Sequence, residues 1–232
     1  MSVNEFNLIL VKISTLLDAL KDHAEQVVFV GGAVTSLLIT EKAAFRVRPT
    51  KDIDIIVQNK NRNGFYKFEE DLRSLGFKQK MVADDPICRW YLDEIIVDVV
   101  PTSEEILTFG NAWYEIAFRD SIQLPLIDER PFKVISAPMF ICTKLNAFDD
   151  RGNNDYANSH DMEDIVCVID GRPELIDEVK RCDPSAKENL KIRFADLLKT
   201  DEFIGSLEYQ IPFGSIGREQ IIIDRMHAIA DL

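Results

Sequence analysis

The sequence predicts an α+β protein built in two parts. Short runs rich in β-branched residues alternate with helical patterns up to about residue 135. After Pro138 the pattern is helical almost throughout. Strands followed by a block of helices are typical of an α+β arrangement. We therefore expect an α/β core with an N-terminal helix at residues 1–135 and a helical region at residues 136–232.

The first part contains the predicted strands. Helical spacing of leucines predicts a helix over 4–23, and the glycine pair at 31–32 opens a second helix. A third predicted helix runs over 64–77, where Gly76 provides a C-terminal stop. Asp93 and Glu94 separate two strand patterns that form an antiparallel hairpin. The predicted strands occupy residues 26–30, 52–58, 87–92, 95–101, 113–118, 122–127 and 132–136.

The second part contains five predicted helices. Apolar residues recur at helical spacing in each of them. They cover residues 139–151, 156–170, 172–182, 186–199 and 218–231.

Composition and charge narrow the class of protein. A composition of 46% hydrophobic and 29% charged residues is typical of a soluble globular protein. No apolar run approaches the roughly 20 residues of a membrane helix, and we expect no signal peptide and a cytoplasmic location. The four cysteines form no CxxC motif, which favours reduced thiols.

The net charge of −13 argues against general nucleic-acid binding, because neutralisation of phosphates dominates that affinity. The basic stretches "RVRPTK" and "NKNR" are candidates for holding a small nucleic-acid end, or are solvated loops. The acidic balance also allows a basic partner protein.

Three aspartates suggest a metal site in the first part. Asp52 and Asp54 in "DIDIIV" face the same way along a strand, about 6–7 Å apart. Asp98 lies within "IIVDVV", where a mid-strand carboxylate needs a charge partner or a ligand. Carboxylates are ligands for hard cations such as Mg²⁺. The alternative for an isolated DxD is a capping or solvated pair, and the third aspartate favours the metal.

A glycine pair precedes this strand. Gly31 and Gly32 lie between a strand and a helix, so the backbone can approach a phosphate at a helix N-terminus. Thr35 and Ser36 could supply hydroxyl groups to it. No Walker A or GxGxxG pattern is present, and a simple tight turn is the alternative.

The order of these motifs resembles the DNA polymerase β-type nucleotidyltransferase superfamily. The segments "GGAVTSLL", "TKDIDIIV" and "IIVDVVP" carry the resemblance. It implies a nucleotidyltransferase fold, with a small mixed sheet flanked by helices. It also implies that Asp52 and Asp54 bind two metal ions, Mg²⁺ or Mn²⁺. Asp98 would complete the site and help to activate the attacking hydroxyl.

The second part suggests a branch of that superfamily. Lys144 and Arg151 are seven residues apart, and Asp161 and Asp164 are three apart, so each pair shares a helix face. Taken alone, this pattern is typical of antiparallel helices with exposed salt bridges.

Together with "RPTKDID", which runs from Arg48 through Thr50 to Asp54, the pattern resembles the AbiEii-type toxin nucleotidyltransferases. The resemblance implies that Lys144 contacts the triphosphate, that Asp161 lies near the catalytic pocket and that Asp164 structures it. Arg48, Thr50 and Arg151 belong to the same motifs and are expected to bind nucleotide. His160 stands where that group usually has lysine.

The expected activity is metal-dependent transfer of a nucleoside monophosphate from a nucleoside triphosphate, such as ATP, to an acceptor hydroxyl, releasing pyrophosphate. The helical region would complete the nucleotide pocket. The acceptor stays open between a tRNA end, a protein and a small molecule, and the resemblance implies a possible antitoxin partner. The alternatives are a nucleotide-binding protein of this fold without turnover and a DxD glycosyltransferase.

Overall fold

The chain forms two compact units. Residues 35–48 interrupt the first unit in the sequence but belong to the second, and they are called the exchanged segment below. The computed structural model describes residues 3–41, 47–59, 61–80, 85–211 and 215–232. The first unit comprises Met1–Val34 and Pro49–Ile135, and the second comprises Thr35–Arg48 and Ser136–Leu232. Residues 35–48 therefore group with the helical part of the chain.

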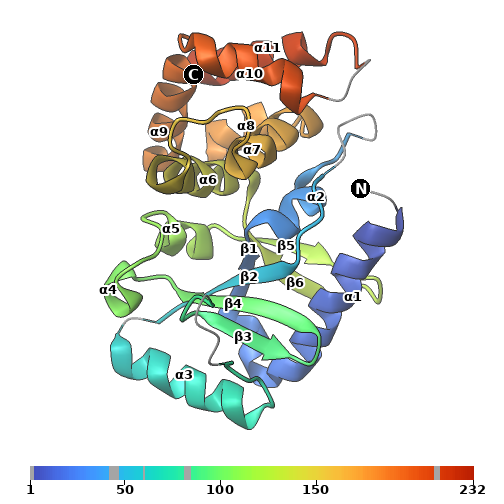
Figure 1. Cartoon of the computed structure of the whole chain (residues 1–232), viewed down its shortest axis with the longest axis vertical. Coiled ribbons are helices and arrows are strands. Elements are labelled where there is room, and N and C mark those ends of the chain that lie inside the picture. The colour runs from blue at the N-terminus through green and yellow to red at the C-terminus, as the bar shows by residue number, and fades with distance from the viewer. Residues whose placement is uncertain (1–2, 42–46, 60, 81–84, 212–214) are drawn as a thin grey trace. The chain divides into compact units, whose positions relative to one another are not determined.

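A six-stranded mixed sheet forms the centre of the first unit (Figure 1). The strand order is β3-β4-β2-β1-β6-β5. Strand β2 runs parallel to β4 and β1 runs parallel to β6, whereas the other three neighbouring pairs are antiparallel. The mixed sheet confirms the α+β class. The strands are β1 (Val27–Val30), β2 (Asp52–Val57), β3 (Arg89–Leu92), β4 (Ile95–Pro101), β5 (Ile122–Pro125) and β6 (Pro131–Val134).

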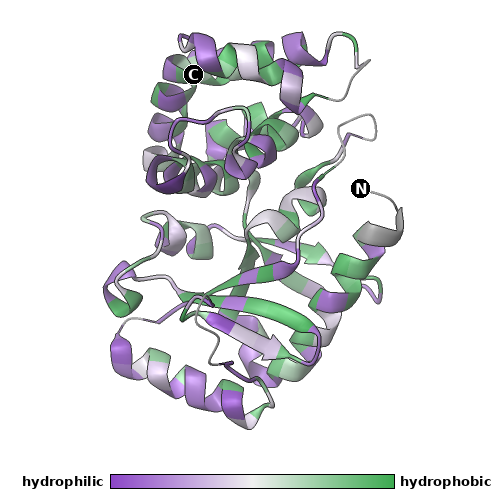
Figure 2. Ribbon diagram, viewed as in Figure 1, coloured by the Kyte–Doolittle hydropathy of each residue, from purple (hydrophilic) through white to green (hydrophobic). Residues whose placement is uncertain are grey.

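Helix α3 shows how the local sequence sets an element of this unit. Asn61 caps its N-terminus by accepting a hydrogen bond from the Gly64 N–H at 2.9 Å. Its buried residues, Phe65, Phe68 and Leu72, follow helical spacing. Figure 2 shows the remaining surface of α3 as mainly hydrophilic and β4 as mainly hydrophobic. The helical elements are α1 (Val3–Leu20), the 3₁₀ turns η1 (Lys21–Gln26) and η2 (Gly32–Val34), α3 (Arg62–Ser74), α4 (Glu104–Leu107) and α5 (Tyr114–Arg119).

Two predicted elements of the first half differ from the structure. The segment 113–118 was predicted as a strand but belongs mostly to α5, where the Ala117 N–H donates to the Trp113 carbonyl at 2.8 Å. Aromatic residues favour strands only weakly, and the position of the segment in the fold overrides that preference. The helix expected after the glycine pair is a 3₁₀ turn followed by the single-turn α2 (Thr35–Leu38).

Helices build the second unit. Ser159 caps α7, since its hydroxyl accepts a hydrogen bond from the Met162 N–H at 3.3 Å. The prediction did not include α10. Besides α2, the helices are α6 (Ala137–Arg151), α7 (His160–Gly171), α8 (Leu175–Arg181), α9 (Pro184–Leu197), α10 (Asp201–Gln210) and α11 (Arg218–Ala230). Across the described ranges, no helix is long and apolar enough to cross a membrane.

Ion pairs tie the exchanged segment and the last helix to α7. Arg218 on α11 contacts the fully buried Asp170 at 2.6 Å and Glu41 at 2.8 Å. The guanidinium of Arg225 donates to the Ile169 carbonyl at 2.8 Å, which satisfies part of the α7 C-terminus. Burial raises the pKa of Asp170, and the hydrogen bond from Arg218 opposes this. Arg218 and Arg225, for which the sequence suggested no role, therefore hold α11 against α7.

Candidate functional site

Strand register places the three predicted aspartates on one face of the sheet. The parallel pairing of β2 with β4 sets Asp54 opposite Asp98, and Asp52 precedes Asp54 by two residues on the same face. Ile53 and Val97 face the other way and are buried. Asp52, Asp54 and Asp98 are called the carboxylate group below.

Arg89 is a member of this site that the sequence analysis missed. It pairs with Asp98 across the β3–β4 hairpin. Its Nε and Nη2 atoms donate to the two oxygens of Asp98 at 2.9 and 2.8 Å, and Nη2 also donates to Asp52 Oδ2 at 2.9 Å. Hydrogen bonding to Asp98, against the opposing effect of burial, raises the pKa of Arg89. The expectation that Asp98 needs a charge partner or a ligand is thus confirmed.

The sequence held a signal for this contact. A two-residue turn at Asp93 and Glu94 fixes the hairpin register, and counting back from it sets Arg89 opposite Asp98. Applying that register to the predicted hairpin would have identified the pair.

Asp54 lies against the glycine turn. Gly31 has φ +73°, and a Cβ there would lie 2.6 Å from the Asp54 Cγ and overlap Oδ2. Glycine is therefore required by both backbone angle and space. Gly32 is buried at the start of η2. The two glycines form a tight turn, and Asp54 fills the space beside Gly31.

The hydroxyls that follow the turn are buried. The Thr35 side chain is fully buried and that of Ser36 is almost so, and neither hydroxyl oxygen has a hydrogen-bond partner among the residues that the structure describes. Buried polar groups are normally hydrogen-bonded, so an ordered water molecule is the expected partner of each of these oxygens.

The carboxylate group fits a divalent cation by ligand type, but its oxygens do not converge on one point. Within the described residues, no three His, Cys, Asp or Glu side chains are grouped closely enough to hold a metal ion. Asp52 and Asp98 turn toward the guanidinium of Arg89, whereas Asp54 lies against Gly31. Arg89 thus places a positive charge between Asp52 and Asp98, whose oxygens are the type of ligand that a hard cation prefers.

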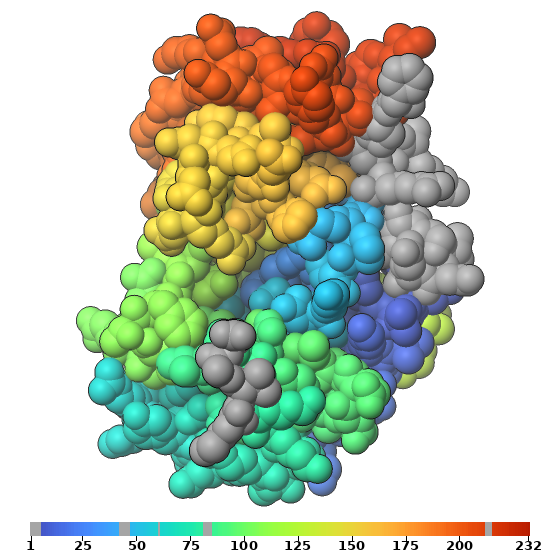
Figure 3. Space-filling view, in the orientation of Figure 1, coloured from blue at the N-terminus to red at the C-terminus, as the bar shows by residue number. Residues whose placement is uncertain are grey.

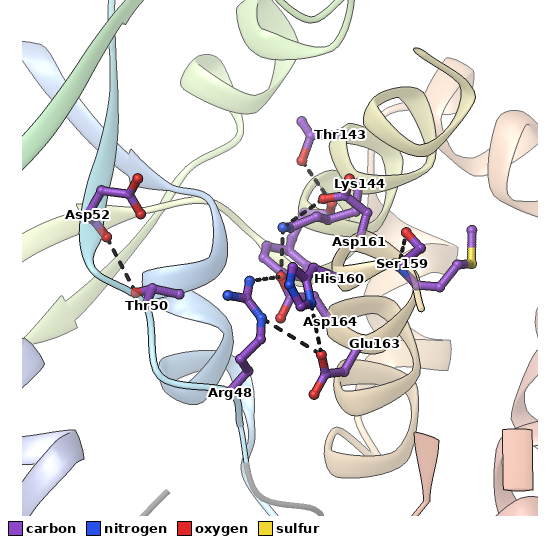
Figure 4. Close-up of polar contacts among 12 residues, drawn as sticks. Arg48, Thr50, Asp52, Thr143, Lys144, Ser159, His160, Asp161, Glu163 and Asp164 are labelled. Atoms are coloured by element: carbon purple, nitrogen blue, oxygen red, sulfur yellow. Dashed lines mark hydrogen bonds and ion pairs between the residues drawn. The ribbon is translucent and has the colours of Figure 1, made fainter. Parts of the chain in front are cut away.

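A second group of charges lies in the helical unit. Lys144 on α6 is only 7% exposed, and its Nζ atom lies 3.0 Å from Asp161 Oδ1 and 2.6 Å from Asp164 Oδ2 on α7. Figure 4 shows the lysine directed between the two aspartates. Burial would lower the pKa of Lys144, but the charges of Asp164 and Asp161 outweigh it and raise the pKa. The predicted pairs on α6 and α7 therefore meet in a buried ion network.

Two arginines extend this network. Arg151 donates to both oxygens of Asp161, at 2.8 and 2.9 Å. Arg48 points toward α7, with Nε 3.7 Å from Glu163 and Nη2 3.9 Å from Asp164 (Figure 4). Burial would raise the pKa of Asp161, and the hydrogen bonds and charges of Arg151 and Lys144 lower it instead. Three cations and three carboxylates therefore balance one another here.

This network borders a cavity of about 510 Å³, called the cationic pocket below. Its charged lining residues are the cations Arg48, Lys144 and Arg151 and the carboxylates Asp155 and Asp161, and Ser159 and His160 also line it. The N-terminus of α7 opens into it and adds the positive end of a helix dipole. His160 is largely exposed, with Nδ1 3.4 Å from Glu163 Oε2. The yellow surface in Figure 3 comes from the segment around residues 152–160, most of which is exposed.

The motif "RPTKDID" is divided between the units. Arg48 belongs to the second unit, whereas Thr50 and Asp52 belong to the first. The Thr50 hydroxyl donates to the main-chain oxygen of Asp52 at 3.3 Å. Thr50 thus supports the start of β2 through the backbone.

No protein-family model matches the chain, and no curated protein matches it.

Proposed function

We propose that this protein is a metal-dependent nucleotidyltransferase with the fold of the polymerase β-type superfamily, on its AbiEii-like branch. The observation that carries the proposal is the parallel pairing of β2 with β4, which sets Asp54 opposite Asp98 with Asp52 on the same face. Three carboxylates on one sheet face beside a glycine turn match the residues on which the resemblance rests. The six-stranded mixed sheet is consistent with this fold.

The carboxylate group is assigned to the metal. Asp52, Asp54 and Asp98 would hold Mg²⁺ or Mn²⁺, which when bound neutralises charge that develops on the phosphate oxygens. Asp98 is also the base that takes the proton of the acceptor hydroxyl. That hydroxyl then attacks the α-phosphorus of the nucleoside triphosphate in line, a P–O bond breaks, and pyrophosphate leaves.

The cationic pocket is assigned to the phosphate chain. Among the residues that line it, the three cations Arg48, Lys144 and Arg151 outnumber the carboxylates of Asp155 and Asp161, and the α7 N-terminus favours an anion. Thr35 and Ser36 are not among the residues that line this pocket, and their hydroxyl groups are buried. Each assignment is supported within one unit and can be tested separately.

The acceptor is defined here only by its hydroxyl group. A tRNA end, a protein and a small molecule all provide one, and the net charge of −13 disfavours a large nucleic-acid footprint. An antitoxin protein is a further partner implied by the resemblance alone.

One observation favours a second candidate function. The guanidinium of Arg89 pairs with Asp52 and Asp98, two carboxylates that a catalytic metal would need, and this favours a nucleotide-binding protein without turnover. Such a protein would bind ATP or CTP in calorimetry and release no pyrophosphate with any acceptor.

The test is transfer of label from each α-³²P-labelled nucleoside triphosphate, with Mg²⁺ or Mn²⁺, into the macromolecules and small molecules of a cell extract. Wild-type protein is expected to label one class of acceptor. Asp98→Asn should reduce labelling by at least about 100-fold, because it removes both a ligand and the base.

Asp93→Asn is the matched control, since it makes the same change at the turn of the same hairpin. Asparagine also tolerates the positive φ of 50° found there. Equal labelling by Asp98→Asn and wild type would refute the proposed function.

A further inference from the structure

The guanidinium of Arg89 lies between Asp52 and Asp98, two of the three carboxylates assigned to the metal. Its Nη2 atom lies 2.9 Å from Asp52 Oδ2 and 2.8 Å from Asp98 Oδ2. A second bond, from Nε to Asp98 Oδ1 at 2.9 Å, makes the contact with Asp98 bidentate. A guanidinium stays charged at every pH a protein tolerates, so it acts here as a permanent counter-ion.

A third carboxylate lies near the same guanidinium. Asp85 Oδ1 is 3.7 Å from Nη1 of Arg89, and Asp85 Oδ2 accepts a hydrogen bond from the Tyr91 hydroxyl at 2.7 Å. Tyr91 lies on β3 with Arg89, so the hydrogen bond holds Asp85 beside that strand. Arg89 therefore has a carboxylate partner outside the carboxylate group.

Asp52 and Asp98 need one cation between them, and they have room for either Arg89 or a divalent ion. Two carboxylates that share a partly buried site repel each other, and a cation between them removes that repulsion. Asp98 is largely buried, with a side chain 11% exposed, so it needs such a partner more than the half-exposed Asp52. Arg89 and a divalent ion would use the same oxygen atoms, so the two cannot occupy them together.

We propose that Arg89 competes with the divalent cation for Asp52 and Asp98. Arg89 holds the two carboxylates together in the metal-free protein and moves toward Asp85 when the ion binds. Metal affinity is thereby set below the value that the carboxylates alone would give. The inference rests on the proposed function, because it concerns the metal site of the proposed nucleotidyltransferase.

The experiment measures Mn²⁺ binding to the whole chain, from the electron paramagnetic resonance signal of free Mn²⁺. Arg89→Ala is expected to bind Mn²⁺ about tenfold more tightly than wild type, which corresponds to about 1.4 kcal/mol. Arg89→Lys retains the charge but loses the bidentate contact with Asp98, so its Mn²⁺ affinity should lie between those of wild type and Arg89→Ala.

Arg62→Ala is the matched control for charge. It removes one positive charge from the same unit at an exposed residue whose guanidinium contacts the Glu105 carbonyl at 3.4 Å. Its Mn²⁺ affinity should equal that of wild type.

Two further readouts separate competition from damage to the fold. Methylguanidinium at millimolar concentration should weaken Mn²⁺ binding to Arg89→Ala by occupying the vacated space, whereas tetramethylammonium at the same ionic strength should not. Mn²⁺ should also raise the melting temperature of Arg89→Ala by more than that of wild type, because at one Mn²⁺ concentration the stabilisation grows with the logarithm of the affinity.

The outcomes distinguish this inference from the proposed function. Equal or weaker Mn²⁺ binding by Arg89→Ala overturns the competition, and the metal site still stands if Asp98→Asn abolishes binding. Failure of both wild type and Arg89→Ala to bind Mn²⁺ overturns the metal site and the competition together. Tighter binding that methylguanidinium reverses supports the inference, whether or not any acceptor is labelled.

Discussion

Gly31 is fixed by two separate constraints, its backbone angle and the side chain of Asp54. Its φ of +73° lies in the left-handed region, and the space for a Cβ is filled by the Asp54 carboxylate. Gly76 meets the first constraint alone, with φ +95° and no atom within 4 Å of a Cβ. Comparing Gly31 with Gly76 therefore separates two contributions to the free energy of unfolding, backbone strain and displacement of the Asp54 carboxylate.

The residue-scale prediction compares Gly31→Ala with Gly76→Ala. Gly76→Ala should lower the free energy of unfolding by about 1–2 kcal/mol, the cost of a left-handed alanine. Gly31→Ala should cost clearly more, because Asp54 must also move. Urea denaturation of both variants measures the difference.

A double variant checks the cause. Gly31→Ala combined with Asp54→Ala should be more stable than the sum of the two single changes predicts, since truncation of Asp54 relieves the overlap. If the two changes in the free energy of unfolding are additive, the Asp54 side chain does not clash with an alanine at position 31.

Helices α6 and α7 are joined at the element scale by a buried lysine. Lys144 contacts Asp161 and Asp164, and all three side chains are less than 10% exposed. Removing one member of a buried charge group leaves its partners buried without compensation. This network therefore holds the two helices in register in addition to lining the cationic pocket.

Lys144→Met should lower the free energy of unfolding by about 3–5 kcal/mol, as loss of one partner from a buried ion pair does. The control is Lys180→Met, because Lys180 also pairs with an aspartate, Asp177 at 2.7 Å, but in an exposed setting. Its stability should match that of wild type, because exposed pairs contribute little. Thermal denaturation compares them, and equal melting temperatures for the two variants would contradict the role of Lys144.

At the scale of the whole molecule, each unit has its own core. In the second unit, Arg218 joins the exchanged segment at Glu41 to the buried Asp170 of α7. Two hydrogen bonds join the same segment to the end of α7. The Thr40 N–H donates to the Gly171 carbonyl at 2.9 Å, and the Arg172 guanidinium donates to the Leu38 carbonyl at 2.6 Å. Residues near the C-terminus thus stabilise a helix that borders the cationic pocket.

Arg218→Met should lower the stability of the second unit by about 3–5 kcal/mol, because Asp170 loses its ion pair. Hydrogen exchange followed by mass spectrometry should show faster exchange in α7 and α11, with amides of β4 unchanged. Arg181→Met, at an exposed residue of the same unit, is the control. An equal loss of protection in β4 would show that the two units unfold together.

Local periodicity explains how much of this architecture could be predicted. Alternation along "DIDIIV" sets Asp52 and Asp54 on one face, and the two-residue turn at Asp93 determines that Arg89 meets Asp98. These features depend on neighbours in the chain, so the sequence by itself determined them, together with the α+β class.

Contacts between distant segments were decided only by the tertiary structure. The parallel pairing of Asp54 with Asp98 depends on a crossover connection, whose path no local pattern encodes. The burial of Lys144 and the helical conformation of residues 114–119 likewise depend on what packs around them. Side-chain periodicity is a property of one segment, whereas register between segments and burial are properties of the whole fold.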